Sequence, residues 1–467
     1  MNYAEKEEAY SISEKPSGKD ARGGSSSRGT VRIYEVPKKH RSKNLDAYTP
    51  RLVSIGLLHY GESQLQGMED NKMEYASHFS RRFGVTWDKL PEQVSNQLQL
   101  VCNCYPIHVV KALNQPEKNL HEIIFTDGAF IVELFLKNHF IGMREKGDFI
   151  FDNPWVSNDV LHDLLLFENQ LPFRFLATLF NTFVSVKNYN NLRKSLDDDV
   201  LLHHPPSFEE LAHKYFSNVG NTGKVLLANA DFRPTRHLLE FLFVLHQRYE
   251  DQNRDRPSFD QITQQVDEKT DLIKCPTATE LNAAGVKFRY GKGKKRLCIG
   301  FDNDKGILTI PRLVVNDLTE TFFRNMVAFE QSGNSSTKFI SNSVILLDNL
   351  IDTPKDVEIL VKHKIFKNEL GTNQQVADLF NNLYKEFLTD PMEFDFAEEV
   401  RDLNKYRRTI WHRLNSNTTK WLAILRRDYF HSPWSIIGVV GGALILILTV
   451  IQTVCSLIPI FKKGVCE

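Results

Sequence analysis

The sequence predicts a mainly α-helical protein that carries a small antiparallel β-sheet near residues 286–310 and a transmembrane helix at its C-terminus. Apolar residues recur at helical spacing along most of the 467 residues. The runs VKFRY, RLCIGF and ILTIP are β-prone, and the turn sequences GKGKK and DNDKG separate them. The final apolar run is longer than the roughly 20 residues that a helix needs to cross a membrane. These three observations define the predicted fold class.

The composition is that of a folded protein with a disordered start. Hydrophobic residues make up 42% and charged residues 25% of the chain, as is typical of globular domains. Residues 1–30 are polar, include ARGGSSSRGT and predict a disordered tail. The formal net charge is zero, so charge gives no reason to expect nucleic acid as a partner. The six cysteines form no CxxC pair, and the glycine-rich run near Gly291 lacks phosphate-loop spacing. We therefore predict no cofactor.

The helical part of the domain is expected over residues 31–250. Its clearest helix is FTDGAFIVELFL (125–136), where Asp127 is expected to cap the N-terminus and apolar residues follow at helical spacing. A second clear helix is TRHLLEFLFVLHQRY (235–249), which places four leucines on one face. Both segments are apolar enough to contribute to a large helical core.

A polar segment precedes the part of the domain that contains the sheet. Residues 251–275 are polar and charged, and predict a linker or loop. Residues 276–390 are expected to complete the domain with the predicted β-hairpin and further helices. Helix starts are predicted at Thr353, which a proline follows, and at Thr372, which forms a capping box with Gln375.

The C-terminal region predicts a membrane anchor. Residues 391–433 predict a cationic membrane-proximal helix, because eight basic residues and one acid lie between Arg401 and Arg427; we expect it to lie against anionic headgroups. Residues 434–461 predict the transmembrane helix, since positions 436–460 contain no charged residue. The expected interfacial anchors are Trp434, Lys462 and Lys463, and residues 462–467 form a short tail.

The charges that flank the apolar segment predict the orientation of the protein. The excess of basic residues before the segment places the N-terminal body in the cytoplasm by the positive-inside rule. The chain is therefore expected to be a single-pass protein of the plasma membrane or an endomembrane. The glycosylation sequons at Asn334 and Asn417 would be modified only in the opposite orientation.

Polar residues interrupt two apolar helical patterns. If the helix that includes Asp159 continues through LLLFENQLPFRFL (164–176), Glu168 lies on the same face as three leucines and points into the core. FFRNMVAFEQ (322–331) repeats this arrangement. We predict that the polar residues of both stretches form a buried structural clamp. Its members are Glu168, Asn169, Gln170, Glu330 and Gln331.

The clamp has a structural and a catalytic interpretation. Burying a carboxylate is costly unless it is bonded, so Glu168 is expected to pair with an arginine such as Arg174 or Arg324. Pro172 is expected to kink the helix, and the two amides would bond the carbonyls that the kink frees. Alternatively, Glu168 and Glu330 could act as the acid and base of a hydrolase. The structural interpretation is favoured because buried polar groups are usually bonded, and no residue is assigned as catalytic.

Several motifs together resemble one plant family. IYEVPKKHR, AYTPRLVSIGLLHYG, FTDGAFIVELF, DLLLFENQLPF, ATELNAAGVKF and TIPRLVVNDLTETFFRNMVAFEQ resemble the family called domain of unknown function 247, from about Val31 to the apolar span. The sequence departs from the family in SIGLLHYG, where SIGPYHHG is expected, so Leu57 replaces a proline and Tyr60 a histidine. This departure weakens any role for a histidine pair in chemistry.

The resemblance implies an α-rich plant protein with a C-terminal transmembrane helix and no established enzymatic activity. The leading hypothesis is a non-enzymatic, membrane-anchored protein that acts through protein–protein recognition or signalling. Its partners would be the lipid bilayer and an unidentified protein. Some grass members of the family are linked to self-incompatibility, so a pollen-side determinant of self-recognition is one alternative. The hydrolase that uses Glu168 and Glu330 is the other.

Overall fold

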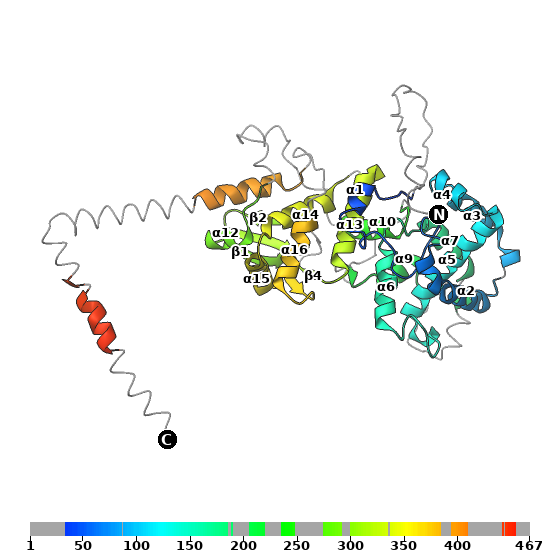
Figure 1. Ribbon diagram of the computed structural model, residues 1–467, viewed down its shortest axis with the longest axis horizontal. Helices are drawn as coiled ribbons and strands as arrows, with labels where there is room; N and C mark the ends of the chain where they lie inside the picture. Colours follow the sequence, from blue (N-terminus) through cyan, green and yellow to red (C-terminus); the bar gives the residue numbers. More distant parts are fainter. Residues whose placement is uncertain are drawn as a thin grey trace, which may run out of the picture.

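The computed structural model describes residues 33–85, 87–184, 188–189, 205–219, 235–247, 274–291, 299–334, 337–383, 394–409, 441–442 and 444–453. Figure 1 shows the helices of the N-terminal half gathered at one end of the body, and the small sheet with α12, α14, α15 and α16 at the other end. The prediction of a mainly helical fold with a small sheet is confirmed. One hydrophobic core joins both ends, with buried residues from Ile33 to Leu403.

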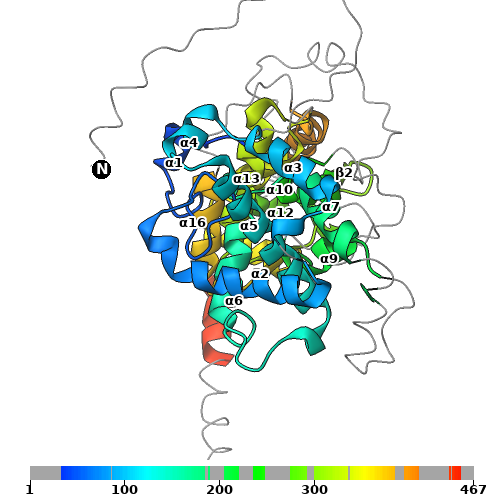
Figure 2. The ribbon, with the colours of Figure 1, turned by 90° about the vertical axis from the view of Figure 1, so that its right-hand side faces the viewer.

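The N-terminal half is built around one long helix, α5. Figure 2 shows α5 in the middle of this half, where it contacts α2, α3, α7 and α9. Its apolar side chains point in all directions and are buried over almost the whole second half of the helix, as expected of a core helix. The elements are α1 (Lys38–Arg41), η2 (Ser63–Met68), α2 (Glu69–Phe83), η3 (Trp87–Lys89), α3 (Glu92–Cys102), α4 (Ile107–Ala112), α5 (Glu117–His139), η4 (Ile141–Met143), α6 (Pro154–Leu164), α7 (Phe173–Phe183), α9 (Phe208–Tyr215) and α10 (Leu238–Gln247).

The prediction that Asp127 caps this helix is wrong. The helix begins ten residues earlier, after Pro116, and Asp127 lies in its interior. The first residues of α5 are polar and mostly exposed, so the apolar pattern begins only where the helix enters the core. A buried aspartate in the middle of a helix needs a partner from another element.

The helices of the C-terminal half begin at recognisable capping sequences. Thr353 and Asp356 form a capping box at the start of α15. Thr372 and Gln375 bond each other's backbone N–H groups at the start of α16, which confirms the predicted capping box. The elements are α12 (Ala278–Ala283), α13 (Thr319–Phe329), the π-helix η7 (Glu330–Asn334), α14 (Phe339–Leu350), α15 (Pro354–Lys362) and α16 (Asn373–Leu383).

The small sheet has three strands, β1 (Lys287–Gly291), β2 (Gly300–Asp302) and β3 (Ile307–Pro311), in the order β1-β3-β2. The prediction that it is antiparallel is wrong, because β1 pairs with β3 in parallel and only β2 and β3 are antiparallel. The strand with the most buried residues, β3, takes the centre. Turn sequences predict where the chain reverses, but not which strands become neighbours. A second, parallel pair joins β4 (Leu313–Val315) and β5 (Phe366–Asn368).

The described part of the predicted membrane-proximal segment is a helix over residues 397–409. Phe394, Val400 and Leu403 are buried, and the ring of Tyr406 packs edge-on against Phe301 of β2 at 5.5 Å. One face of this helix therefore belongs to the core. The remainder of the segment, residues 391–393 and 410–433, lies outside the described residues.

The predicted membrane span is described only at residues 441–442 and 444–453, which are helical. Across the described ranges, no helix is both long enough and apolar enough to cross a membrane. The predicted tail at residues 1–30, the predicted anchors Trp434, Lys462 and Lys463, and nearly all of the linker at 251–275 fall outside the described residues.

Candidate functional site

The three polar residues predicted at the centre of the clamp lie in a loop between two helices. α6 ends at Leu164, and α7 begins after Pro172, which occupies its N-cap position. We name residues 165–172 the ENQ loop. The expectation of one continuous helix that Pro172 kinks is wrong, because proline is also favoured where a helix begins. The loop is nevertheless buried along its entire length.

Glu168 is buried in the ENQ loop and binds the N-terminal segment, which we define as residues 33–62. Its carboxylate accepts hydrogen bonds from the backbone N–H of Val36 and from the guanidinium of Arg41. The Nε2 atom of His59 lies 3.1 Å from the Glu168 Oε2 atom. The partner of Glu168 is therefore Arg41, and not Arg174, which is exposed, or Arg324, which pairs with Glu320.

Burial alone would raise the pKa of the Glu168 carboxyl. The neighbouring His59 and Arg41 cations overcome this effect and hold the pKa below its ordinary value. Burial would likewise lower the pKa of His59, but the carboxylates of Glu168 and Glu62 raise it above 6.5. The group is thus an ionised carboxylate surrounded by cations. A carboxyl that donates a proton near neutral pH needs a raised pKa, so Glu168 is a poor candidate for a general acid.

The two amides of the ENQ loop bond backbone groups. Asn169 accepts from the N–H of Ile55 at 2.7 Å and donates to the carbonyl of Val53 at 3.0 Å. Gln170 donates to the carbonyls of Leu164 and Leu166, each at 2.9 Å. The two side chains thereby satisfy carbonyls in the last turn of α6 and in the loop itself, which have no helical partner. They also fix the irregular chain of the N-terminal segment where it crosses the core.

Two further aspartates bind the same irregular chain: Asp163, which sequence reasoning missed, and Asp127, to which it gave the wrong role of a helix cap. Asp163, in the last turn of α6, accepts from three successive backbone N–H groups, at Arg51, Leu52 and Val53, at 2.7–2.8 Å. Asp127 of α5 accepts from the N–H of Gly56 at 2.7 Å. The signal for both was present in the sequence, because each carboxylate lies within an apolar helical pattern.

Asp127 also forms a buried ion pair. The ammonium of Lys72 on α2 lies 2.7 Å from Asp127, lies 2.8 Å from Glu69 and donates to the carbonyl of Ser54 at 2.9 Å. Burial raises the pKa of Asp127 to about 6, whereas Lys72 acts in the opposite direction. The short contacts identify an ion pair that ties α2 and α5 to the N-terminal segment.

Glu330 is the second buried acid of the predicted clamp and caps a helix. It is the first residue of η7, and its carboxylate accepts from the N–H of Ile340 at 2.7 Å, the N–H of Ser341 at 2.8 Å and the Ser341 hydroxyl at 2.6 Å. These amides lie in the first turn of α14 and have no helical partner. Burial raises the pKa of Glu330 to about 7, although the Ser341 and Ile340 donors oppose it. Gln331 is half-buried, and its Nε2 atom has no hydrogen-bond partner among the described residues.

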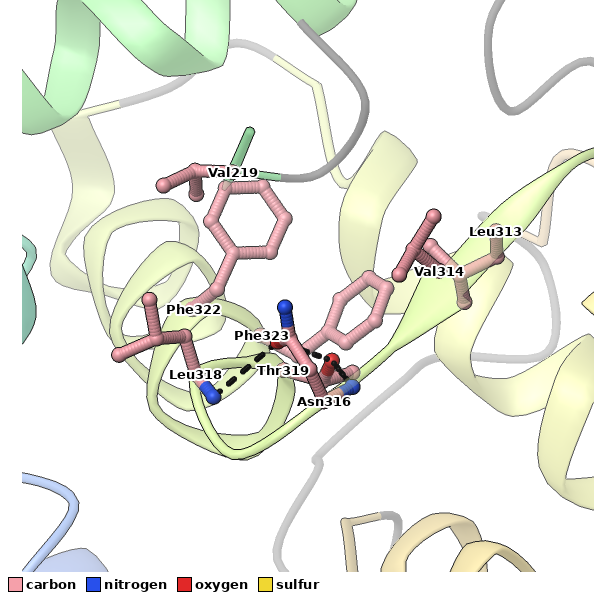
Figure 3. A pocket seen from close by; sticks show the side chains of 8 residues that line it. All are labelled: Val219, Leu313, Val314, Asn316, Leu318, Thr319, Phe322 and Phe323. Atoms are coloured by element: carbon pink, nitrogen blue, oxygen red, sulfur yellow. Dashed lines mark hydrogen bonds between the residues drawn. The ribbon is translucent and has the colours of Figure 1, made fainter. Parts of the chain in front are cut away.

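Glu168 and Glu330 therefore take their donors from different parts of the chain. Glu168 is bonded to the N-terminal segment, and Glu330 is bonded to α14. A pocket between β4 and α13, shown in Figure 3, lies beside neither carboxylate. It is lined mainly by apolar side chains, with hydrogen bonds between Asn316, Leu318 and Thr319 at its base. Its volume of about 10 Å³ is close to what one water molecule needs.

Metal-ligating side chains are not gathered at one point in the described part of the chain. No group of three or more His, Cys, Asp or Glu residues there has a geometry that could hold an ion. The described carboxylates named above instead contact backbone amides, histidine, lysine and arginine. These contacts hold together segments that lie far apart in the sequence.

The comparisons with known proteins agree with the motifs. A family model described as a plant protein of unknown function, DUF247, matches residues 33–448. The chain is 26% identical over 461 residues to the UPF0481 protein At3g47200 of Arabidopsis thaliana, covering 92% of this chain and 88% of that protein. It is 23% identical over 498 residues to the putative UPF0481 protein At3g02645 of the same plant, covering 91% and 89%. No solved structure matches the chain. The protein belongs to the DUF247 family of plant proteins of unknown function.

Proposed function

We propose that this protein is a membrane-anchored, non-enzymatic recognition or signalling protein, whose helical body binds another protein while its C-terminal segment holds it at a bilayer. The observation that carries the proposal is the helix at residues 444–453. Its apolar side chains are exposed at successive positions, for example 66% at Ile445, 67% at Leu446 and 62% at Leu448. A helix that is apolar on every side is stable only where lipid or protein covers it.

The free energy at stake in this segment is large. Transferring one valine, leucine or isoleucine side chain out of water contributes about 1.5–3 kcal/mol, and seven such side chains are more than half exposed between Leu444 and Ile451. The sequence around them extends the uncharged run from position 436 to 460, which is a sufficient length for a bilayer. These properties support a lipid partner for the segment.

The contacts of the buried acids support a non-enzymatic body. Glu168 is held by cations at a lowered pKa, and Glu330 caps α14. The hydrolase alternative requires both carboxylates to face one substrate, whereas their donors belong to different segments. The arrangement favours a stable scaffold. The pollen-side role in self-incompatibility stays a prediction that follows from the family resemblance.

Membrane extraction tests the anchor. We expect the full chain to stay in the membrane pellet after alkaline carbonate washing. Replacing Leu446 and Leu448 by lysine should release it, because each charge at the centre of a membrane helix costs about 2.5–3.5 kcal/mol. The matched control replaces Leu100 and Ile107 by lysine, since both side chains are exposed on the body, at 56% and 71%. This control variant should stay in the membrane pellet like the wild type. A wild-type chain that carbonate removes from the membrane would refute the anchor.

Two further measurements address the orientation and the partner. A cytoplasmic body predicts no glycan at Asn334 or Asn417, so a mass shift after glycosidase treatment would contradict this orientation.

Proximity labelling from the anchored protein in floral tissue should identify a reproducible protein neighbour. If the anchor determines the location of the protein, the wild type and the variant with lysine at Leu446 and Leu448 should label different sets of neighbouring proteins. Detection of a turned-over substrate would contradict the non-enzymatic proposal.

A further inference from the structure

A run of basic residues surrounds one serine near the start of the described chain. Residues 38–43 are KKHRSK, which contains four lysines and arginines, one histidine and no acid. Ser42 therefore has basic residues at the fourth, third and first positions before it and at the position directly after it. Protein kinases that select their substrates by charge recognise such a pattern in the linear sequence. The run is thus a candidate recognition sequence for a kinase that prefers basic substrates.

The hydroxyl of Ser42 is accessible to a kinase. Ser42 is exposed, and its Oγ atom donates a hydrogen bond to the carbonyl of Lys39 at 3.0 Å. No donor from the described part of the chain bonds to this oxygen. Since a hydroxyl oxygen has two lone pairs, the Oγ atom is available for attack on a phosphorus atom.

The helix that carries these basic residues can open at little cost. α1 has four residues, none of them buried, and no side chain caps its N-terminus. A helix of a single turn has little stability of its own, because nucleation is costly and few hydrogen bonds follow. Residues 38–43 can therefore unwind into the extended form in which a kinase binds its substrate.

Arg41 links Ser42 to the core of the protein. Its guanidinium binds the buried Glu168 carboxylate, while the Arg41 side chain stays 26% exposed. A phosphoserine carries a charge of roughly −1.5 to −2 at pH 7, and arginine binds phosphate as well as carboxylate. A phosphate on Ser42 would therefore compete with Glu168 for Arg41. It would also replace the hydroxyl hydrogen that Ser42 donates to the carbonyl of Lys39.

We propose that Ser42 is a phosphorylation site for a serine kinase that prefers basic substrates, and that its phosphate draws Arg41 away from Glu168 and loosens the N-terminal segment on the ENQ loop. In the reaction, the Ser42 Oγ atom attacks the γ-phosphorus of ATP, its proton passes to a carboxylate of the kinase, and the bond between the γ-phosphorus and the oxygen of the departing ADP breaks. The inference rests on the cytoplasmic orientation of the proposed function, because ATP is the cosubstrate. It does not require the apolar C-terminal segment, since the site belongs to the helical body.

Phosphorylation of the purified full chain tests the site. The catalytic domain of a kinase that prefers basic substrates, supplied with ATP and Mg²⁺, should phosphorylate Ser42, and mass spectrometry of the peptides locates the phosphate. Ser63 is also exposed but has no basic residue within three positions, so it is the internal control and should stay unmodified. Replacing Lys38 and Lys39 by glutamine keeps the serine but should lower kcat/KM roughly tenfold, because two ion pairs with the kinase are lost. Absence of phosphate at Ser42, or equal rates at Ser42 and Ser63, would overturn the site.

Hydrogen exchange tests the effect of the phosphate on Arg41. In the phosphorylated chain, the backbone amide of Val36, which donates to Glu168, should exchange roughly tenfold faster, as expected when one hydrogen bond between charged groups is lost. The variant Arg41→Gln lacks the group for which the phosphate competes, so phosphorylation should not accelerate its exchange further. Unchanged exchange in the phosphorylated wild type would overturn the proposed loosening. Equal acceleration in the wild type and in Arg41→Gln would show that the phosphate acts without Arg41, and would also overturn it.

The outcomes separate this site from the proposed function. A chain that stays in the membrane after carbonate washing but gains no phosphate at Ser42 would overturn the site and leave the anchor intact. A chain that carbonate releases but that is phosphorylated at Ser42 would refute the anchor and support the site. A glycan at Asn334 or Asn417 would place the body away from cytoplasmic ATP and would overturn both the orientation and the site.

Discussion

The Nε2 atom of His59 lies 3.1 Å from the Oε2 atom of Glu168, in the interior of the protein. The other ring nitrogen of His59 lies 2.8 Å from Glu62. One buried imidazole thus stands between two carboxylates. With Arg41 and the backbone of Val36, it joins the N-terminal segment to the ENQ loop. The stability of the whole N-terminal half should depend on this contact, because it connects segments that no helix or strand joins.

Glu168→Gln should destabilise the protein without abolishing its fold. The substitution keeps the shape of the side chain, but it leaves Arg41 without its counter-charge and leaves His59 with only the Glu62 carboxylate. Breaking a buried ion pair costs roughly 3–5 kcal/mol, and we expect the lower part of this range, because the Arg41 side chain is 26% exposed and partly screened by water. Chemical denaturation measures the loss.

The control for Glu168→Gln is Glu358→Gln, which changes an exposed glutamate on α15. It should alter the free energy of unfolding by no more than about 0.5 kcal/mol. A Glu168→Gln protein as stable as the control would refute the structural role. A stable variant that had lost a measurable activity would instead favour the catalytic interpretation of the ENQ loop.

The ion pair between His59 and Glu168 should make stability depend on pH. The pKa of His59 is raised above 6.5 in the folded protein, so its contribution is complete below pH 6.5 and is lost as the pH rises through the raised value. The pKa of Glu168 is lowered from 4.5, so its contribution is complete above pH 4.5 and is lost as the pH falls through the lowered value. The pair should stabilise most between these two limits.

The variant His59→Gln isolates this effect. The difference in unfolding free energy between wild type and variant should be largest between pH 4.5 and 6.5, and it should shrink as the pH rises further. Comparing the two proteins at each pH removes the contributions of other groups, such as Glu330. A difference that stays constant from acid to alkaline pH would show that His59 acts only by packing.

Gly56 and Gly61 offer a matched pair of substitutions. Both have positive φ, +76° and +82°, so alanine should cost about 1–2 kcal/mol at either position. A Cβ atom at Gly61 would meet open space, but one at Gly56 would overlap the Tyr105 hydroxyl and lie 2.9 Å from the carbonyl oxygen of Gln170. The Tyr105 hydroxyl donates to that same carbonyl at 2.7 Å.

Gly56→Ala should therefore lose about 1–3 kcal/mol more than Gly61→Ala, through overpacking of the core. The measurement is the difference between the unfolding free energies of the two variants. If both variants lose the same free energy of unfolding, the contact between the N-terminal segment and the ENQ loop can rearrange without loss of stability. That result would contradict the close packing from which the role of this loop is argued.

The features that could be predicted from the sequence are those that depend on neighbouring residues. The predicted helix at 235–249 corresponds to α10, because its leucines follow a local period. The capping box joins Thr372 and Gln375, which are only three positions apart, and was predictable for the same reason. Each of these signals lies within a single helix and its cap.

The features that could not be predicted depend on distant contacts. Arg41 and Glu168 are 127 positions apart, so helical spacing gave no means of choosing Arg41 over Arg174. Pro172 was misinterpreted because proline both breaks and begins helices, and only the buried loop before it distinguishes the two. The parallel pairing of β1 with β3 likewise depends on which strand the core selects for the centre of the sheet.

The attachment of the helix at residues 397–409 can be tested at Gly306, in the turn between β2 and β3. Gly306 has φ +61°, and a Cβ atom there would overlap the Tyr406 hydroxyl and lie 2.8 Å from its Cζ atom. Gly306→Ala should therefore push Tyr406 away from Phe301 and loosen the helix, at a cost of about 1–3 kcal/mol from overpacking. Gly285→Ala is the control, since Gly285 has φ +80° and open space around it. Hydrogen exchange should accelerate in residues 397–409 for Gly306→Ala alone. If both variants or neither accelerate, Tyr406 does not hold this helix on the sheet.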